Sequence, residues 1–534
     1  MTKSIQSALL VFAFLGCYQL SSAQVAIKKM EMFLNLVNNI YVEDVNIDSL
    51  VEIGITSILE NLDPHSVYLS RDELKKANEP LEGNFDGVGI QFNIFEDTIN
   101  VIHVIVGGPS QKVGILDGDK IITINGDTVA GVGYTNDSVI KNLRGPKGTE
   151  VEVGIKRNSE PGLLKFLITR DKIPLYALDA AYMIQNNIGY IKLSRFSKTA
   201  TEEVTSAIDS LKNLGMKNLI LDLTGNGGGY LNQAEGLADQ FLDEGKLIVY
   251  TEGRAQPRQN LIATALGDFE KGKLVIMVDG SSASASEIVS GAIQDWDRGV
   301  IVGRRTYGKG LVQKGYGLPD GSAVRLTIAH YYIPSGRFIQ RPYDKGIKKY
   351  IEDALDRYET GELFDEKKLV LADSTPYYTN DGRVVYADGG IIPDVYVPLD
   401  TTWRTPFYSK LLRAGIFNKF TIKYVNNNRS ALTSQYKDAQ SFARSFVVSD
   451  ELWKEFLDYA ADNKIKPDST QNTIDSEENM KLQIKALIAQ NIFDSKAYYQ
   501  IINSLDPIYR EAVKVIKSKD YKTLLKPRKE KNKN

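Results

Sequence analysis

The sequence predicts a multidomain protein of the α/β class, and three observations lead to this prediction. The chain of 534 residues is too long for a single hydrophobic core. Between about residues 172 and 398, apolar segments of strand length alternate with helical patterns, which is typical of a sheet covered by helices on both faces. The pattern changes on either side of this region, so we expect further domains to flank the sheet.

Composition indicates an ordinary globular protein. Hydrophobic residues make up 43% and charged residues 25% of the chain, and the net charge is −2. A balance so close to neutral gives no reason to expect nucleic acid or an anionic membrane as a partner. Three histidines and one cysteine lie scattered without metal-ligand spacing, so we expect no metal and no disulfide within the chain.

The first residues predict export. Lys3 precedes the apolar run 8–16, and small residues follow up to Ala23, which is the pattern of a signal peptide over residues 1–23. The run is shorter than the roughly 20 apolar residues that a membrane helix needs. An alternative interpretation takes residues 14–17 as a lipobox, with a lipid anchor on Cys17. In both interpretations the protein works outside the cytoplasm, and we expect it in the periplasm.

Residues 24–81 predict a small helical region. Apolar residues recur near a 3.6-residue period in two runs, at 30–40 and 50–59. The region ends in Leu-Asp-Pro-His-Ser-Val-Tyr-Leu at 62–69. His65 in this motif follows a proline, where a histidine more often serves a turn or a cap than catalysis.

Residues 82–170 predict a small α+β domain. Strands are expected at 87–92, 99–106, 119–125 and 150–157, with short helices after Pro109 and at 136–143. The glycines in Gly87-Val88-Gly89-Ile90 allow backbone N–H groups to converge on a carboxylate, and the next strand can pair with an extended peptide. These residues, followed by Gly107 to Gly126, resemble a PDZ domain, and the resemblance implies a free peptide C-terminus as the ligand. The alternative is a small β-barrel that only spaces domains.

Residues 171–400 predict the α/β core. The expected strands cover 188–196, 218–223, 247–251, 273–279 and 300–304, and the expected helices cover 199–215, 231–242 and a segment from Ser284 to Trp296. Active sites gather in loops at the carboxyl ends of such strands. Ser284 and the glycine-rich loop 224–229 both fall there. Residues 401–534 predict a helical extension with a basic tail, which we expect to be solvated.

Ser284 and Lys309 are the candidate catalytic pair, 25 residues apart. A serine hydroxyl is a poor nucleophile unless a base takes its proton, and a desolvated lysine can do so without histidine. The pattern Ser284-x-x-Glu287 also matches a helix capping box, which taken alone is the more common meaning. A serine at a helix N-terminus, however, has the next N–H, that of Ala285, directed toward any oxyanion that forms.

Two further groups complete the candidate site. A lysine has an ordinary pKa of about 10.4, so burial must lower it before the amine can act as a base. Gln313, four residues after Lys309, is a suitable partner because an amide orients an amine without adding charge. The loop 224–229 lacks the P-loop pattern, and its Gly228 N–H is our candidate for the second oxyanion donor.

Several segments together resemble the carboxyl-terminal processing peptidases, also called tail-specific proteases. They are Leu62 to Leu69, the PDZ-like segment, Asp222 to Gly229, Ser281 to Ile288, Lys309 with Gln313, and Gly389 to Asp394, in the family's order over about residues 30–400. The resemblance implies a crotonase-like catalytic core with an inserted PDZ domain. It also implies Ser284 as nucleophile, Lys309 as general base, Gln313 as its partner, and the N–H groups of Gly228 and Ala285 as the oxyanion hole.

The same resemblance implies a serine endopeptidase that needs no cofactor and acts on protein or peptide substrates with a free C-terminus. Thr224 stands where the family usually has arginine, and Gly227 where it usually has proline, which bears on the loop shape around Gly228. An activating adaptor protein and a homo-oligomer stay open. The rival hypothesis is a non-catalytic scaffold that holds protein tails, although the intact set of Ser284, Lys309 and Gln313 argues against it.

Overall fold

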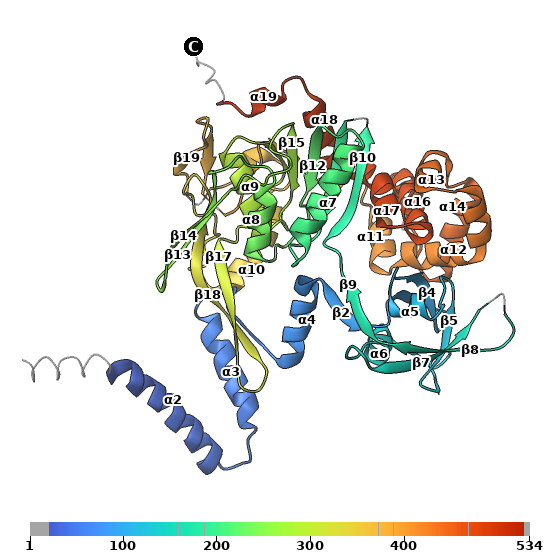
Figure 1. The fold of residues 1–534 in the computed structure, drawn as a ribbon, viewed down its shortest axis with the longest axis horizontal. Coiled ribbons are helices and arrows are strands. Elements are labelled where there is room, and N and C mark those ends of the chain that lie inside the picture. Colours follow the sequence, from blue (N-terminus) through green and yellow to red (C-terminus); the bar gives the residue numbers. More distant parts are fainter. Residues whose placement is uncertain are drawn as a thin grey trace, which may run out of the picture. The chain divides into compact units, whose positions relative to one another are not determined.

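The computed structural model describes residues 21–157, 160–185, 187–371, 373–387, 389–467 and 469–527 (Figure 1). It forms two compact units, one of Met1–Arg71 with Gly315–Leu326 and one of Asp72–Lys314 with Thr327–Asn534. The apolar run 8–16, Cys17 and the last basic residues, 528–534, lie outside the described residues. The predictions about export signal, lipid anchor and basic tail therefore stay predictions.

The smaller unit is mainly helical. It contains α2 (Ser21–Ile40), α3 (Ile47–Glu60) and the short strand β1 (Val67–Leu69), which pairs antiparallel with the first residues of β18 (Ala323–Tyr332). Both helices agree with the periodicity, whereas β1 was not predicted. His65 lies in the turn before β1, where its N–H donates to the Asp63 carboxylate at 2.8 Å. Among the described residues, none of the helices combines the length and hydropathy that a membrane span needs.

The PDZ-like segment folds as an antiparallel sheet with two short helices. Its strands run in the order β3-β4-β5-β7-β8, so β3 is an edge strand. The strands are β3 (Ile90–Phe95), β4 (Thr98–Val104), β5 (Lys120–Ile124), β6 (Asp127–Thr128), β7 (Glu150–Lys156) and β8 (Leu164–Thr169), and the helices are α5 (Pro109–Lys112) and α6 (Asn136–Leu143). Alternate residues of β7, for example Val151 and Val153, are buried in the domain's own core. Strand β8 is the main element that the sequence did not predict.

A six-stranded sheet lies at the centre of the larger unit. Its order is β10-β11-β12-β15-β16-β21, and all neighbours from β11 onward are parallel. The strands are β10 (Leu178–Gln185), β11 (Ile188–Leu193), β12 (Asn218–Asp222), β15 (Leu274–Val278), β16 (Val300–Gly303) and β21 (Val395–Tyr396). Every residue of β11, β15 and β16 is buried. This agrees with the prediction of a sheet covered on both faces.

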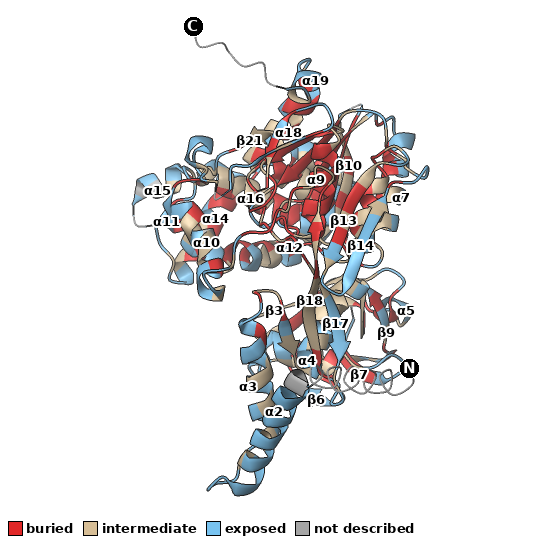
Figure 2. Ribbon diagram, turned by 90° about the vertical axis from the view of Figure 1, so that its left-hand side faces the viewer, coloured by how far each residue is buried: buried red, intermediate tan, exposed pale blue. Residues whose placement is uncertain are grey.

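Helices from distant parts of the chain cover the two faces. One face packs against α7 (Ala200–Asn213), α8 (Leu231–Asp239) and α9 (Ala285–Asp295), and the other against α18 (Pro507–Lys517). All of α9 is buried, and it lies within the most buried part of the protein in Figure 2. The Arg337 guanidinium forms a buried ion pair with Asp295, at 2.8 Å, and so holds the last residue of α9.

A second sheet adjoins the core. It contains β13 (Leu247–Gly253), β14 (Gln256–Ile262), β17 (Leu311–Gly317) and β18, with β13 pairing antiparallel to the second half of β18. The sequence predicted β13 but not β14, β17 or β18. Polar residues interrupt these strands, so their pattern is weaker than that of the buried parallel strands.

The C-terminal region has two parts. A helical domain, which we define as residues 406–502, has its own aromatic core. It comprises α11 (Pro406–Arg413), α12 (Ile416–Gln435), α13 (Ala439–Ser445), α14 (Asp450–Asp462), α15 (Thr470–Ile474), α16 (Glu477–Ile492) and α17 (Ser495–Ile502). Helix α18 packs instead against the central sheet. The sequence analysis predicted a single helical extension, because both parts show the same helical periodicity.

Candidate active site

Ser284 occupies the turn between β15 and α9. Its backbone φ is +56°, a conformation that costs free energy for a residue with a side chain. The flanking residues Ala283 and Ala285 are buried, whereas Ser284 is partly exposed. The strained turn therefore presents this serine at the N-terminus of a fully buried helix, where the helix dipole favours negative charge.

The Glu287 carboxylate joins the backbones of Ser284 and Lys309. Its Oε2 accepts the Ser284 N–H at 2.8 Å and the Lys309 N–H at 2.9 Å. These two nitrogens bind one oxygen atom, so they lie at most 5.7 Å apart, the sum of the two distances. Residues separated by 25 positions in the sequence thus meet at one point of the fold.

The second oxygen of Glu287 is also fully used. Oε1 accepts the Thr306 hydroxyl at 2.5 Å and the Gly308 N–H at 2.7 Å. Glu287 is fully buried, and burial raises the pKa of its carboxyl, while the four donated hydrogen bonds oppose that shift. Four donors at two oxygens suit an ionised carboxylate that serves as the hub of the site.

Tyr331, on β18, lies between the same two backbones. Its hydroxyl contacts the carbonyl oxygen of Lys309 and, at 3.2 Å, that of Ser284. Burial raises the pKa of Tyr331 well above its usual value, so the hydroxyl keeps its proton near neutral pH. Tyr331 therefore links the segments of Ser284 and Lys309 through their carbonyl groups.

Gln313 lies on β17, four residues after Lys309. Its side-chain Nε2 donates to the Thr327 hydroxyl on β18 at 3.2 Å. The amide is thereby fixed between two strands of the second sheet. Its predicted hydrogen bond to the Lys309 amine stays a prediction.

The glycine-rich loop that follows β12 packs directly against Ser284. A Cβ added at Gly228 would lie 2.8 Å from the Ala283 carbonyl oxygen and 2.9 Å from the Ser284 Cβ, and the φ of Gly228 is +98°. No other residue fits at such a distance and φ without displacing its neighbours. The loop is therefore held at van der Waals contact with the predicted nucleophile.

Asn226 fixes this loop from inside. It is fully buried, its Nδ2 donates to the Leu193 carbonyl at 2.9 Å, and its Oδ1 accepts the Gly228 N–H at 2.9 Å. The Gly228 N–H, predicted as an oxyanion donor, is thus engaged with Asn226. The Ala285 N–H belongs to the first residue of α9 and has no intrahelical acceptor.

Three residues of this arrangement escaped the sequence analysis as parts of the site. Glu287 was identified only as a capping partner, and Asn226 only as a letter of the glycine-rich loop. The charge of Glu287 directly before apolar Ile288 and Val289 was an available signal, whereas Asn226, which stands between glycines, carried none. Tyr331 carried no local signal, because its role depends on β18, which was not predicted.

The second candidate site is the loop that precedes edge strand β3. Gly89 has a φ of +77°, and a Cβ there would lie 3.1 Å from Ile173 and 3.2 Å from Pro109. The Val88 carbonyl accepts the N–H and hydroxyl of Ser110, at 3.0 and 2.7 Å, so this oxygen faces the domain. Gly87, Val88, Gly89 and Ile90 therefore form a tight loop at the start of a strand with one unpaired edge.

Metal ligation has no counterpart among the residues described. The structure shows no group of three or more His, Cys, Asp and Glu side chains that could hold an ion within the described ranges.

Comparison with known families finds three matches along the chain. Peptidase family S41 matches residues 187–352, and the PDZ domain family matches residues 87–166. A family of unknown function matches residues 407–494, which fall in the helical domain.

Individual relatives agree with the peptidase match. The carboxy-terminal processing protease CtpA of Bacillus subtilis is 32% identical over 380 residues, covering 70% of this chain and 80% of the relative. CtpB of the same organism is 32% identical over 329 residues, covering 61% of this chain and 67% of the relative. A solved photosystem II D1 C-terminal processing protease is 28% identical and covers 58% of this chain and 83% of its own, with a TM-score of 0.33.

Proposed function

The chain belongs to the carboxy-terminal processing proteases of peptidase family S41, and from this premise we propose that it cleaves peptide bonds with Ser284 as nucleophile and Lys309 as general base. The enzyme class and the presence of a PDZ domain follow from the family. One observation supports the residue assignment most strongly: the N–H groups of Ser284 and Lys309 bind the same oxygen of buried Glu287.

In the proposed reaction, the Ser284 Oγ attacks the carbonyl carbon of the scissile peptide. Lys309, as a neutral amine, takes the hydroxyl proton and passes it to the nitrogen of the leaving peptide as the C–N bond breaks. The remaining acyl group is an ester on Ser284. Water then attacks this ester, Lys309 takes the water proton and returns it to Oγ, and the new carboxyl terminus leaves.

The tetrahedral intermediate needs hydrogen-bond donors for its oxyanion. The Ala285 N–H meets this need, because it lies at the N-terminus of α9 next to the nucleophile. Gly228 is the second proposed donor, and its N–H must turn from Asn226 toward the oxyanion to serve. Gln313 is proposed to orient the Lys309 amine from β17.

Substrate selection is proposed to start at the PDZ domain. The loop 87–90 would bind the terminal carboxylate of a protein tail through backbone N–H groups, and the unpaired edge of β3 would pair with the tail's last residues. Export is also proposed, through a cleaved signal peptide over residues 1–23 and with action in the periplasm; a lipid anchor on Cys17 is the alternative. Activation by an adaptor and assembly into a homo-oligomer are compatible with these sites.

The proposal is tested with an unstructured protein that ends in apolar residues, prepared with a free and with an amidated C-terminus. Mass spectrometry should detect fragments from the wild-type chain and none from Ser284→Ala, and the free carboxylate should be preferred. Equal cleavage by Ser284→Ala would refute the assignment of the nucleophile. Tail binding without cleavage by the wild type, in the presence and absence of periplasmic extract, would favour the scaffold hypothesis.

A further inference from the structure

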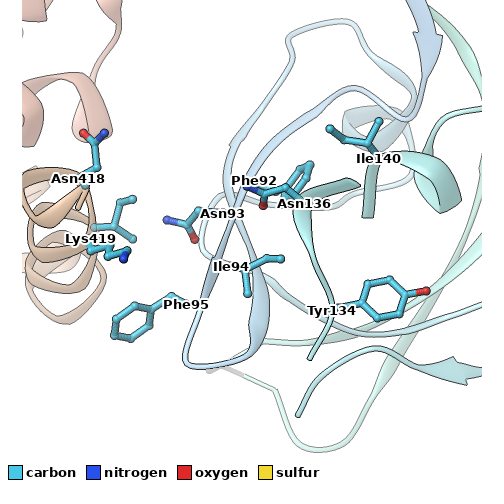
Figure 3. A pocket seen from close by; sticks show the side chains of 11 residues that line it. Phe92, Asn93, Ile94, Phe95, Tyr134, Asn136, Ile140, Asn418 and Lys419 are labelled. Atoms are coloured by element: carbon cyan, nitrogen blue, oxygen red, sulfur yellow. The ribbon is translucent and has the colours of Figure 1, made fainter. Parts of the chain in front are cut away.

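A cavity of about 710 Å³ lies between the PDZ domain and helix α12 of the helical domain (Figure 3). Strand β3 contributes Phe92 to Phe95, α6 contributes Ile140, and α12 contributes Asn418 and Lys419. This volume lies within the range of sites that hold small ligands or a few residues of peptide. The edge of β3, where a protein tail would bind, is therefore bounded by a second domain.

Helix α12 presents two different faces. Phe417, Phe420 and Val425 are buried in the core of the helical domain. Residues 415, 418, 419 and 422 recur at intervals of three, one and three positions, so they share the other face of the helix, and all four line the cavity. Among the described residues, these four are not part of the core of the helical domain, so this face of α12 is available to contact a ligand in the cavity.

Strand β3 also divides its side chains by the two-residue period of a strand. Phe92 and Ile94 pack against the PDZ core, on the side of Ile140. Asn93 and Phe95 point the other way, toward Asn418 and Lys419 (Figure 3). A peptide strand added beside β3 would have the same alternation, with one set of side chains facing α6 and the other facing α12.

A charge on α12 also acts on the PDZ domain at a second place. Burial acts to raise the pKa of Asp117, yet hydrogen bonds from His103 and the Val104 N–H, together with the charges of His103 and Arg429, hold it below its ordinary value. Arg429 belongs to α12, ten residues beyond Lys419. The helix thus approaches the PDZ domain both at the cavity and at Asp117.

Lys419 is the one charged side chain among the described residues that line the cavity. It is exposed, and within the described part of the chain its ammonium group makes no ion pair. Figure 3 places it next to Phe95, at the end of β3 away from the loop 87–90. An ammonium group in this position complements an acidic side chain of the ligand.

The distance along the strand indicates which ligand residue Lys419 meets. A tail whose carboxylate lies at the loop 87–90 must run antiparallel to β3, because that loop is at the beginning of the strand. Paired strands advance at the same rise per residue. Phe95 lies five positions beyond Ile90, so the tail reaches Lys419 about four to five residues before its terminal carboxylate.

We propose that the helical domain forms one wall of the peptide groove, and that Lys419 selects protein tails with an acidic residue about four to five positions before the free C-terminus. This inference rests on the proposed binding of tails by the PDZ domain. It assigns the helical domain a part in choosing substrates, while the loop 87–90 supplies recognition of the carboxylate.

The test measures binding of short fluorescent peptides to the full-length chain with Ser284→Ala, so that no peptide is cleaved. Each peptide ends in apolar residues, and a single glutamate, glutamine or lysine is placed at successive positions before the end. Every sequence is made with a free and with an amidated C-terminus. The protein variants are Lys419→Gln, Lys419→Glu and, as a matched control, Lys437→Gln, an exposed lysine outside the cavity.

We expect the glutamate peptide to bind about three- to fivefold more tightly than the glutamine peptide at one position, a ratio typical of a partly exposed ion pair. Added salt should reduce this preference. Lys419→Gln should abolish it, Lys419→Glu should favour a lysine peptide instead, and Lys437→Gln should leave it unchanged.

Three results would overturn the inference. They are a wild-type chain indifferent to the position of glutamate, a preference that persists in Lys419→Gln, and tighter binding of every peptide in Lys419→Glu, which would show that α12 blocks the groove. The amidated peptides separate this inference from the proposed function. If they bind as tightly as the free acids, recognition of the C-terminus fails regardless of Lys419.

Discussion

Replacing Glu287 by glutamine is the perturbation that the structure resolves most sharply. The change is isosteric, yet it turns one acceptor oxygen into an NH₂ donor at a fully buried position. The amide nitrogen is expected in place of Oε1, because the Thr306 hydroxyl there can rotate and accept. The Gly308 N–H, which donates to Oε1 at 2.7 Å, then loses its acceptor.

The expected cost follows from these contacts. One buried donor without a partner costs about 1–3 kcal/mol. The bonds from Ser284 and Lys309 to the remaining oxygen persist, but they lose the contribution of a charged acceptor, roughly 1 kcal/mol between them. The neutral glutamine avoids the cost of burying a charge, and this gain offsets part of the loss in stability. We therefore expect a loss of about 2–3 kcal/mol in the free energy of unfolding.

The assay is urea unfolding followed by circular dichroism, together with peptide cleavage under conditions in which the variant is folded. Because Glu287 binds the backbones of both proposed catalytic residues, we expect cleavage to fall at least about tenfold, since a displacement near 1 Å can cost 10²-fold. Glu202→Gln on α7 is the control, since Glu202 is exposed. A Glu287→Gln chain as stable and as active as this control would refute the role of Glu287 as the hub.

Three further predictions address other parts of the account. Lys309→Ala should reduce cleavage about 10²- to 10⁴-fold, the usual contribution of a general base, with an unchanged circular dichroism spectrum. Lys345 is exposed, and Lys345→Ala, the control, should cleave at the wild-type rate. Comparable rates for the two variants would show that another base operates. Gly228→Ala should destabilise the chain by about 1–3 kcal/mol and reduce cleavage, because its Cβ would lie 2.8 Å from the Ala283 carbonyl oxygen. A Cβ at Gly227 would meet open space, so Gly227→Ala should behave as wild type. Equal melting temperatures of the two variants would contradict the close packing of this loop. The hydrogen bond to Asp117 raises the pKa of His103, so the stabilisation from this pair is complete below about pH 6.5 and is lost as pH rises through the raised value. His103→Gln should lower the free energy of unfolding by less than about 1 kcal/mol, because the ring is half exposed, and the loss should be larger at pH 6 than at pH 9. A loss independent of pH would argue against this pair.

Much of the fold could be predicted where local patterns are strong. The strand at 274–278 is wholly apolar, and helix α6 begins at the predicted Asn136 and ends at the predicted Leu143. Strand β18 could not be predicted, because Arg325 and His330 interrupt its apolar residues and two of its pairing partners, β1 and β13, are distant in the sequence. Long-range pairing depends on the finished fold rather than on a local period.

The candidate site shows the same division. Ser284, Lys309 and the loop 224–229 stand out as motifs, and the structure brings their backbones together. The engagement of the Gly228 N–H by Asn226 could not be foreseen, because it depends on the turn of one peptide group. The approach of α12 to the PDZ domain lay equally beyond the sequence, since nothing in the periodicity of α12 says which domain its second face meets.

The central claim is that catalysis proceeds through an ester on Ser284. Its most direct test is mass spectrometry of the full-length chain, quenched in acid while it turns over an activated ester substrate, with proteolytic mapping of any added acyl group. The account predicts an adduct of the acyl mass on Ser284, absent from Ser284→Ala and strongly reduced in Lys309→Ala. An adduct mapped to another residue, or undiminished turnover by Ser284→Ala, would contradict it.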